Sequence, residues 1–355
     1  MVSVFRIKEI LMKNYIIKIV FINLFCFAFT SVQAQLSETY YQKVFSEINS
    51  MLSDNTPLSF TKAVYLTENA YLDDNLNKET FDYFIRLYAS VCKSTIESGD
   101  IIYTEKDKDV AMAQCAVFTF MTDSLPIVIN NRPNVTIPFT YNYDDYAGQK
   151  DWSNTFVSTL MQTQKGNCHS LPYLYKLIMD ELGQECHLAL APNHIYIKAN
   201  NKKVGWYNIE LTCSDFPTDA WLMASGYIHI DAIRNKVYMK ALSNKEAVAM
   251  TLVDLAQGYQ AKYGIGDGSF IIKCCDTALE HFPNYINAML LKGETLTALY
   301  KQTPDNNRME EMNTLYATIH QLGYRKMPNK MYQNWLGSLS ADKSDQRMRS
   351  VLIKQ

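Results

Sequence analysis

Apolar residues recur every three or four positions in the first part of the chain. The clearest stretches cover 36–52 and 79–97, and a weaker one covers 107–122. This period places apolar side chains on one face of an α-helix, where they can pack against a core. The pattern therefore predicts an N-terminal helical region over 35–123.

The pattern changes after residue 123. Prolines and a mixture of Asn, Tyr and Asp residues predict loops with short extended pieces up to residue 148. Helices are expected over 152–162 and 171–182. Three runs of strand-like composition follow, with turn residues between them, at 187–191, 195–199 and 206–211. A helix followed by an antiparallel meander predicts an α+β core over 124–243.

A helical pattern returns near residue 245 and continues in five runs separated by Gly, Pro and Asn. The segment 278–283, followed by Ala288 and Gly293, resembles a tetratricopeptide repeat. Small residues in such repeats permit close helix packing. We expect a repeat-like helical domain over 244–355, and an unrelated helical cap is the alternative. The five runs are 245–263, 269–282, 286–301, 308–322 and 329–339.

Residues 1–34 differ from the rest. Four basic residues precede a mostly apolar run over 19–30, and Val32-Gln33-Ala34 forms a small-residue cleavage pattern. These are the features of a secretory signal peptide, with Met12 as an alternative start. The apolar run is too short to span a bilayer. We expect an exported protein, periplasmic or extracellular, with no stable membrane anchor after cleavage; an uncleaved anchor is the alternative.

Composition narrows the class of protein. Hydrophobic residues make up 48% of the 355 residues, which excludes a disordered or collagen-like chain. The formal net charge of −2 gives no basic footprint for nucleic acid, so none is expected as a partner. Eight cysteines are too few for a disulfide scaffold in a chain of this length.

The segment 166–212 carries the candidate chemistry. Cys168 stands at the expected start of a helix, where the backbone N–H groups and the helix dipole favour a thiolate. His194 opens the second expected strand, and Glu210 lies on the third. A strand that returns beside the helix can place the imidazole next to the sulfur, and a carboxylate on the neighbouring strand can orient the ring. We predict a triad of nucleophile, general base and orienting acid.

These residues stand in the stretches Gly-Asn-Cys-His-Ser (166–170), Asn-His-Ile-Tyr-Ile (193–197) and Trp-Tyr-Asn-Ile-Glu-Leu-Thr (206–212). Together they resemble the core of the transglutaminase-like cysteine superfamily, in a bacterial branch with C-terminal tetratricopeptide-like repeats. The resemblance implies a papain-like core of a helix plus an antiparallel sheet, flanked by the helical regions. It also implies acyl transfer, or the reverse hydrolysis, through the Cys168, His194 and Glu210 triad.

Several assignments stay open. The acid is a glutamate where the superfamily usually has an aspartate, so Asp215 is the second candidate orienter and Asn208 the third. The oxyanion partner is expected to be the backbone N–H of Cys168, with Gln162 or Trp152 as alternative side-chain donors.

No metal or cofactor is expected. Cys186, His187, His194 and Cys213 could form a zinc site, but they lack the paired spacing that zinc ligands usually show.

The sequence is consistent with two functions. One is an exported enzyme, a cysteine protease or a transglutaminase-type acyltransferase, that acts on a peptide or protein substrate. The other is a non-catalytic scaffold of the same core, whose C-terminal helical repeats bind a peptide or protein partner. The sequence leaves open whether the triad is active.

The signal peptide gives the first testable prediction. Because cleavage is expected after Ala34, the exported protein should begin at Gln35. Intact-mass measurement of protein recovered from the periplasm or medium checks this. A mature chain that still begins at Met1 or Met12 would mean that the segment is an anchor.

Overall fold

The computed structural model describes residues 39–129, 131–328 and 330–331. The N-terminal part is helical, as the periodicity predicts: residues 39–52 form a helix, and three more follow. Side chains at the helix starts accept backbone N–H groups, as at Ser59 and Asn77, because the first turn has no partners of its own. The three helices are α2 (Phe60–Tyr71), α3 (Lys78–Glu97) and α4 (Lys108–Thr122).

The strands form three small sheets. β1 (Pro126–Ile129) and β2 (Arg132–Val135) make an antiparallel hairpin, and β3 (Thr140–Tyr141) runs parallel to β4 (Lys165–Gly166). The largest sheet is the expected antiparallel meander, in the order β5-β6-β7. Its strands are β5 (His187–Ala191), β6 (His194–Asn201) and β7 (Gly205–Ile209).

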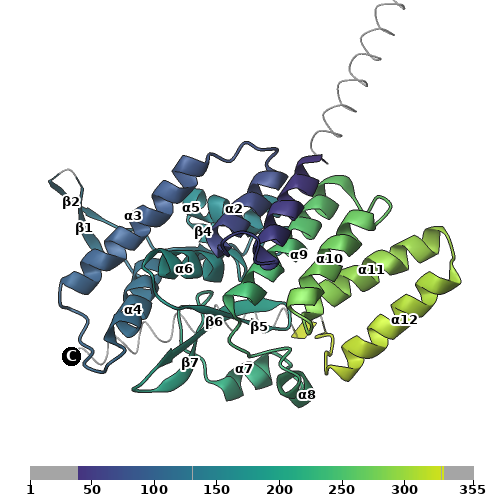
Figure 1. Ribbon diagram of the computed structural model, residues 1–355. Coiled ribbons are helices and arrows are strands. Elements are labelled where there is room, and N and C mark those ends of the chain that lie inside the picture. Colours follow the sequence, from purple (N-terminus) through teal and green to yellow (C-terminus); the bar gives the residue numbers. More distant parts are fainter. Residues whose placement is uncertain (1–38, 130, 329, 332–355) are drawn as a thin grey trace, which may run out of the picture.

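Helix α6 (Ser170–Glu181) occupies the centre of the molecule (Figure 1). Every residue from Ser170 to Met179 is buried, whereas an amphipathic surface helix would bury one face alone. Helices α2, α3, α4 and α5 (Val157–Thr163) pack against it, and β5 and β6 cover another side. The short 3₁₀ helix η1 (Trp152–Thr155) precedes α5. The start of α6 is therefore held from several directions.

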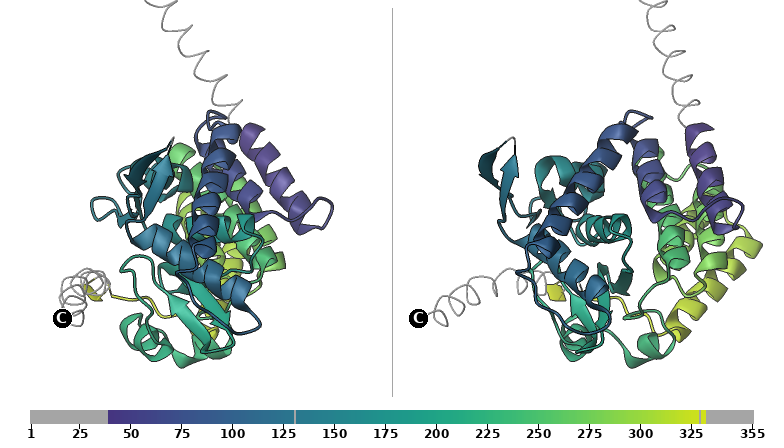
Figure 2. Two further views of the ribbon diagram at one scale, coloured as in Figure 1. Left: turned by 90° about the vertical axis from the view of Figure 1, so that its left-hand side faces the viewer. Right: turned by 60° about the vertical axis from the view of Figure 1, so that its left-hand side comes forward.

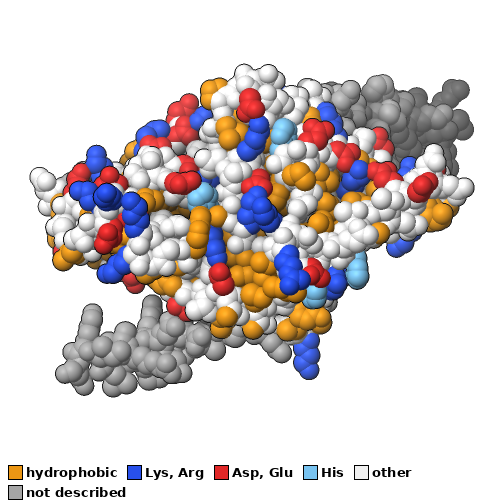
Figure 3. Space-filling model, turned by 60° about the horizontal axis from the view of Figure 1, so that its bottom comes forward, with side chains coloured by type: hydrophobic (Ala, Val, Ile, Leu, Met, Phe, Trp, Pro, Cys, Tyr) orange, Lys and Arg blue, Asp and Glu red, His pale blue; other side chains and the backbone are white. Residues whose placement is uncertain are grey.

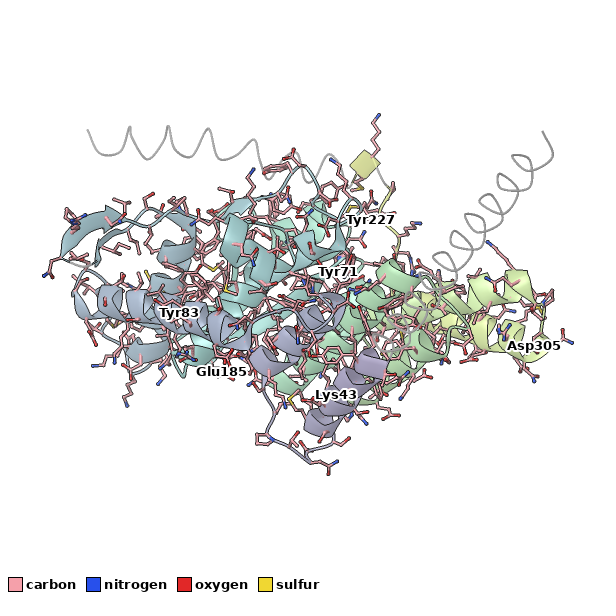
Figure 4. The ribbon with its side chains drawn as sticks, turned by 90° about the horizontal axis from the view of Figure 1, so that it is seen from above. Lys43, Tyr71, Tyr83, Glu185, Tyr227 and Asp305 are labelled. Atoms are coloured by element: carbon pink, nitrogen blue, oxygen red, sulfur yellow. The ribbon has the colours of Figure 1, made fainter. Side chains whose placement is uncertain are left out.

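The C-terminal helices pack in succession, each against the next along the chain. Figure 4 shows Asp305 at the far end of the last hairpin, with Tyr83 of α3 on the other side of the molecule. The longest of them, α9, also packs along α2, so segments far apart in the sequence lie side by side (Figure 2). The helices are α9 (Asn244–Tyr263), α10 (Ser269–His281), α11 (Ile286–Gln302) and α12 (Asn306–Gln321).

The fold class predicted from the sequence is wrong. An α+β, papain- or transglutaminase-like core of a helix plus an antiparallel sheet was expected. The described residues are instead mostly helical, and their sheets have only two or three strands. The reason lies in packing: the central helix is surrounded mainly by other helices, and one hydrophobic core runs from Tyr41 to Ile319. The short strand runs were identified correctly, but they do not form the layer on which the fold is built.

Two short helices, α7 (Asp219–Ser225) and α8 (Ile230–Arg234), complete the underside of the molecule. Phe216, Tyr227 and Ile230 are exposed in and beside them. Figure 3 shows hydrophobic side chains gathered near the middle of this face. Among the described residues, no helix has the length and apolar character needed to cross a bilayer.

Two sequence predictions fall on other parts of the chain. The signal peptide over 1–34 lies outside the described residues, and so does most of the helix expected over 329–339. The boundaries at residues 123 and 243 stay predictions.

The burial of α6 predicts a large effect of truncating its side chains. Leu174 is fully buried, so Leu174→Ala should lower the free energy of unfolding by about 2–5 kcal/mol through lost burial and the cavity left behind. The matched control is Leu87→Ala on α3, where 39% exposure predicts a change within about 0.5 kcal/mol. Urea unfolding followed by circular dichroism measures both. Equal losses in the two variants would contradict this placement of α6.

Candidate active site

A tight turn holds Cys168 at the start of α6. The Asn167 side-chain oxygen accepts the backbone N–H groups of His169 and Ser170, each at 3.0 Å. In return, the Ser170 hydroxyl accepts the N–H of Asn167 at 3.1 Å. A Cβ atom at Gly166 would come within 2.6 Å of that hydroxyl oxygen, so only glycine fits. These contacts fix the direction in which the Cys168 side chain leaves the helix.

The β5–β6 hairpin brings His194 to this turn. Asn193 has a φ of 55° in the hairpin loop, a left-handed conformation that asparagine tolerates better than most residues. Its carbonyl oxygen lies 3.8 Å from the Cys168 sulfur, which donates to it. His194 opens β6 directly afterwards and is buried. The loop thus places the imidazole beside the start of α6.

Glu210 contacts the Nε2 atom of the His194 ring. Its Oε2 lies 2.5 Å from His194 Nε2, and its Oε1 accepts the backbone N–H and the hydroxyl of Thr212. The Glu210 side chain is almost fully buried. Because Nε2 faces Glu210, Nδ1 is the nitrogen left to face Cys168, whose interaction with the ring contributes to the raised pKa of His194. The imidazole is therefore coupled to both the sulfur and the carboxylate.

The charges of the three groups are coupled. Burial alone would lower the pKa of His194, but the negative charge of Glu210, the interaction with Cys168 and the hydrogen bond that the ring donates to Glu210 outweigh it and raise the pKa to about 10. Burial alone would raise the pKa of Glu210, whereas the positive His194 and the Thr212 hydrogen bonds hold it below its usual value. A charged imidazolium beside the sulfur favours the thiolate, the reactive form of cysteine.

The structure brings Cys168, His194 and Glu210 together, although Glu210 lies just beyond β7. The alternative orienters lie elsewhere. Asn208 bonds to Lys198 and Asp219, and Asp215 pairs with Glu210 through backbone hydrogen bonds. The Glu210 side chain, which is one methylene longer than that of an aspartate, reaches the His194 ring from position 210.

The expected oxyanion donor is free of backbone partners. Among the described residues, the N–H of Cys168 donates to no backbone carbonyl, because it precedes the first bonded turn of α6. Gln162 is exposed, and Trp152 lines a separate cavity.

Sequence reasoning did not identify His169 as part of the site. Its Nδ1 lies 3.0 Å from the carbonyl oxygen of Thr155, and its Nε2 lies 3.1 Å from a carboxylate oxygen of Asp254. Both partners are acceptors, so both ring nitrogens must carry protons, and the ring is an imidazolium. Burial opposes this charge, but Asp254 and the Thr155 carbonyl raise the pKa to about 9. A second cation therefore follows Cys168 directly in the chain. No sequence signal pointed to it, because Asp254 comes from α9.

Two cavities lie near these residues. A small one of about 110 Å³ lies behind His169 and is lined by α2, η1, α6 and α9. Glu68 borders it and accepts the N–H groups of Val157 and Ser158, and burial raises the pKa of Glu68 to about 7. The larger, of about 520 Å³, runs from Asn193 along α11 and α12. In the part of the chain that the structure describes, no cluster of His, Cys, Asp or Glu could hold a metal ion.

Comparison with known proteins changes one interpretation. No protein-family model matches the chain, and no curated protein matches it. A solved structure that is similar, "Crystal structure of menin reveals the binding site for Mixed Lineage Leukemia (MLL) protein", has a TM-score of 0.44 and 15% identity, and the match covers 86% of this chain and 66% of menin.

The assignment to the transglutaminase-like cysteine superfamily, and to its branch with tetratricopeptide-like repeats, is wrong: no family model matches the chain, and the described residues are mostly helical rather than a papain-like core. The motif that suggested it spans only a helix start and a hairpin. The same side-chain arrangement recurs on unrelated folds, so a local match of this size does not identify one.

The coupled charges predict the titration of His194. With a pKa of about 10, the ring should stay protonated at pH 8. A folded-state pKa above the unfolded value stabilises the protein; that stability is complete below about pH 6.5 and is lost as the pH rises through about 10. Glu210→Gln removes the negative charge that contributes most to raising the pKa of His194, so this pKa should fall.

NMR of the histidine ring carbons measures this, with the His194 signal assigned by its loss in His194→Gln. Asp215→Asn is the matched control, because Asp215 contacts Glu210 through the backbone. A ring that already loses its proton near pH 6.5 in the unmodified protein would contradict the coupling.

Proposed function

We propose that the chain, after export, is a cysteine-dependent enzyme that cleaves an amide bond or transfers its acyl group, with a peptide or protein as substrate. Cys168 is the nucleophile, His194 the acid and base, and Glu210 the group that orients and charges the ring. The observation that supports this most directly is the buried His194 ring, which lies 2.5 Å from the Glu210 carboxylate and interacts electrostatically with Cys168.

The chemistry needs only groups that the site contains. The Cys168 thiolate attacks the amide carbonyl carbon and forms a C–S bond, and the oxyanion accepts the Cys168 N–H. The C–N bond then breaks as the leaving amine takes a proton from the His194 imidazolium. In the thioester that remains, His194 accepts a proton from water or from a second amine. That nucleophile displaces the sulfur, and the thiolate is restored.

A binding role without chemistry is the second candidate. It is favoured by the 520 Å³ groove, which α11 and α12 line. It predicts that a partner is captured equally well after Cys168→Ala, and that Cys168 reacts no faster than an ordinary thiol. If the protein is an enzyme, Cys168 should instead react faster than an ordinary thiol.

The first test of the enzyme is the reactivity of its nucleophile. Cys168 should react with iodoacetamide at pH 6 on the order of tenfold faster than Cys115, an exposed thiol of the same protein, because the imidazolium favours the thiolate. His194→Gln should remove most of this difference. Peptide mass spectrometry over a time course gives both rates in one sample. Equal rates at Cys168 and Cys115 in the unmodified protein would refute the proposal.

A further inference from the structure

We infer that the groove between Asn193 and the α11–α12 hairpin binds an extended polypeptide segment of the substrate through a large apolar side chain. This rests on the proposed function and adds to it: it makes the substrate a polypeptide rather than a small amide. It also gives the C-terminal helices a part in choosing the substrate.

The position of the groove is the first argument. Asn193 forms one wall, and its carbonyl oxygen lies 3.8 Å from the Cys168 sulfur. A substrate whose carbonyl carbon reaches that sulfur can therefore continue past Asn193 into the groove. Asn193 does not line the small cavity behind His169.

The size of the groove is the second argument. Its volume of about 520 Å³ falls within the range of about 300–1,000 Å³ that is usual for ligand sites. A simple amide would leave most of it empty. An extended chain that leaves the sulfur can continue along the groove, with side chains directed alternately toward its floor and toward solvent.

The lining gives the third argument. Ile319 and Met327 are buried at the groove, and Leu290 adds a partly buried apolar wall. Glu294 and Lys326 are exposed and carry opposite charges. This mixed lining, apolar at Leu290, Ile319 and Met327 and polar or charged elsewhere, matches a peptide whose apolar side chain points inward while its backbone stays hydrated.

The hairpin that forms the wall is held in place. The Tyr316 ring packs over Gly293, where an added Cβ would meet it at 3.1 Å, and the Tyr316 hydroxyl lies 3.2 Å from that of Thr297. Close contact of α11 and α12 at this point keeps the groove formed without a ligand. Preorganisation of this kind lowers the entropic cost of binding a chain.

The experiment compares small and peptidyl alkylating probes on the full chain. Chloroacetyl hexapeptides carry Phe at one of six positions, or Ser at all six, and chloroacetamide serves as the reference. Burial of one large apolar side chain predicts that Phe at one or two positions raises the Cys168 alkylation rate about tenfold over the all-Ser peptide. Leu290→Glu should bring the ratio of Phe-peptide rate to chloroacetamide rate close to that of the all-Ser peptide.

Charge reversal offers a second, exposed variant that does not disturb the core. Glu294→Lys should lower the rate of Cys168 alkylation by peptides with a Lys beside the Phe, relative to peptides with a Glu there. Glu310→Lys on α12 is the matched control, because Glu310 is exposed and does not line this groove. For each variant the peptide rate is divided by the chloroacetamide rate of the same variant, which shows whether Cys168 is still reactive.

The outcomes separate the two proposals. If chloroacetamide reacts at Cys168 no faster than at Cys115, the proposed function fails. If Cys168 is fast but all hexapeptides react alike, the enzyme stands and the groove inference fails. It also fails if Glu310→Lys changes peptide preference as much as Glu294→Lys.

Discussion

The buried contact between His194 and Glu210 is the interaction on which the candidate site depends. An imidazole in the interior would normally be neutral, because burial penalises its charged form. The carboxylate reverses this, and it is in turn satisfied by the backbone and hydroxyl of Thr212. A charged pair without such support would be costly to bury. The Glu210–Thr212 turn therefore decides whether the sulfur faces a cation or a neutral ring.

A second histidine, His169, is also fixed next to Cys168 in the chain. The His169 imidazolium is fixed by Thr155 and Asp254, and Asp254 also accepts the Tyr173 hydroxyl at 2.9 Å. These partners come from η1, α6 and α9. Cys168 thus interacts electrostatically with two histidines whose charges are set by parts of the chain far apart in sequence.

The local elements could be predicted from the sequence, whereas contacts between residues far apart in the chain could not. The meander and the helix after Cys168 follow from strand composition and from an apolar run. Glu210 could be proposed from its place on the third strand run, yet only the structure shows that its side chain reaches His194. The fold class failed because periodicity reveals which face of a helix is buried but not what covers it. His169 was missed for the same reason, since its partner Asp254 lies 85 positions away.

The packing of α2 against α9 has a consequence for how the chain is made. Tyr71 accepts a hydrogen bond from Lys262, 191 residues later, and the Thr67 hydroxyl reaches the carbonyl of Thr251. Contacts of such long separation are slow to form. During synthesis the face of α2 that packs on α9 stays uncovered until residues 244–263, which include Asp254, have been added. A chaperone that shields this surface would act before the candidate site can assemble.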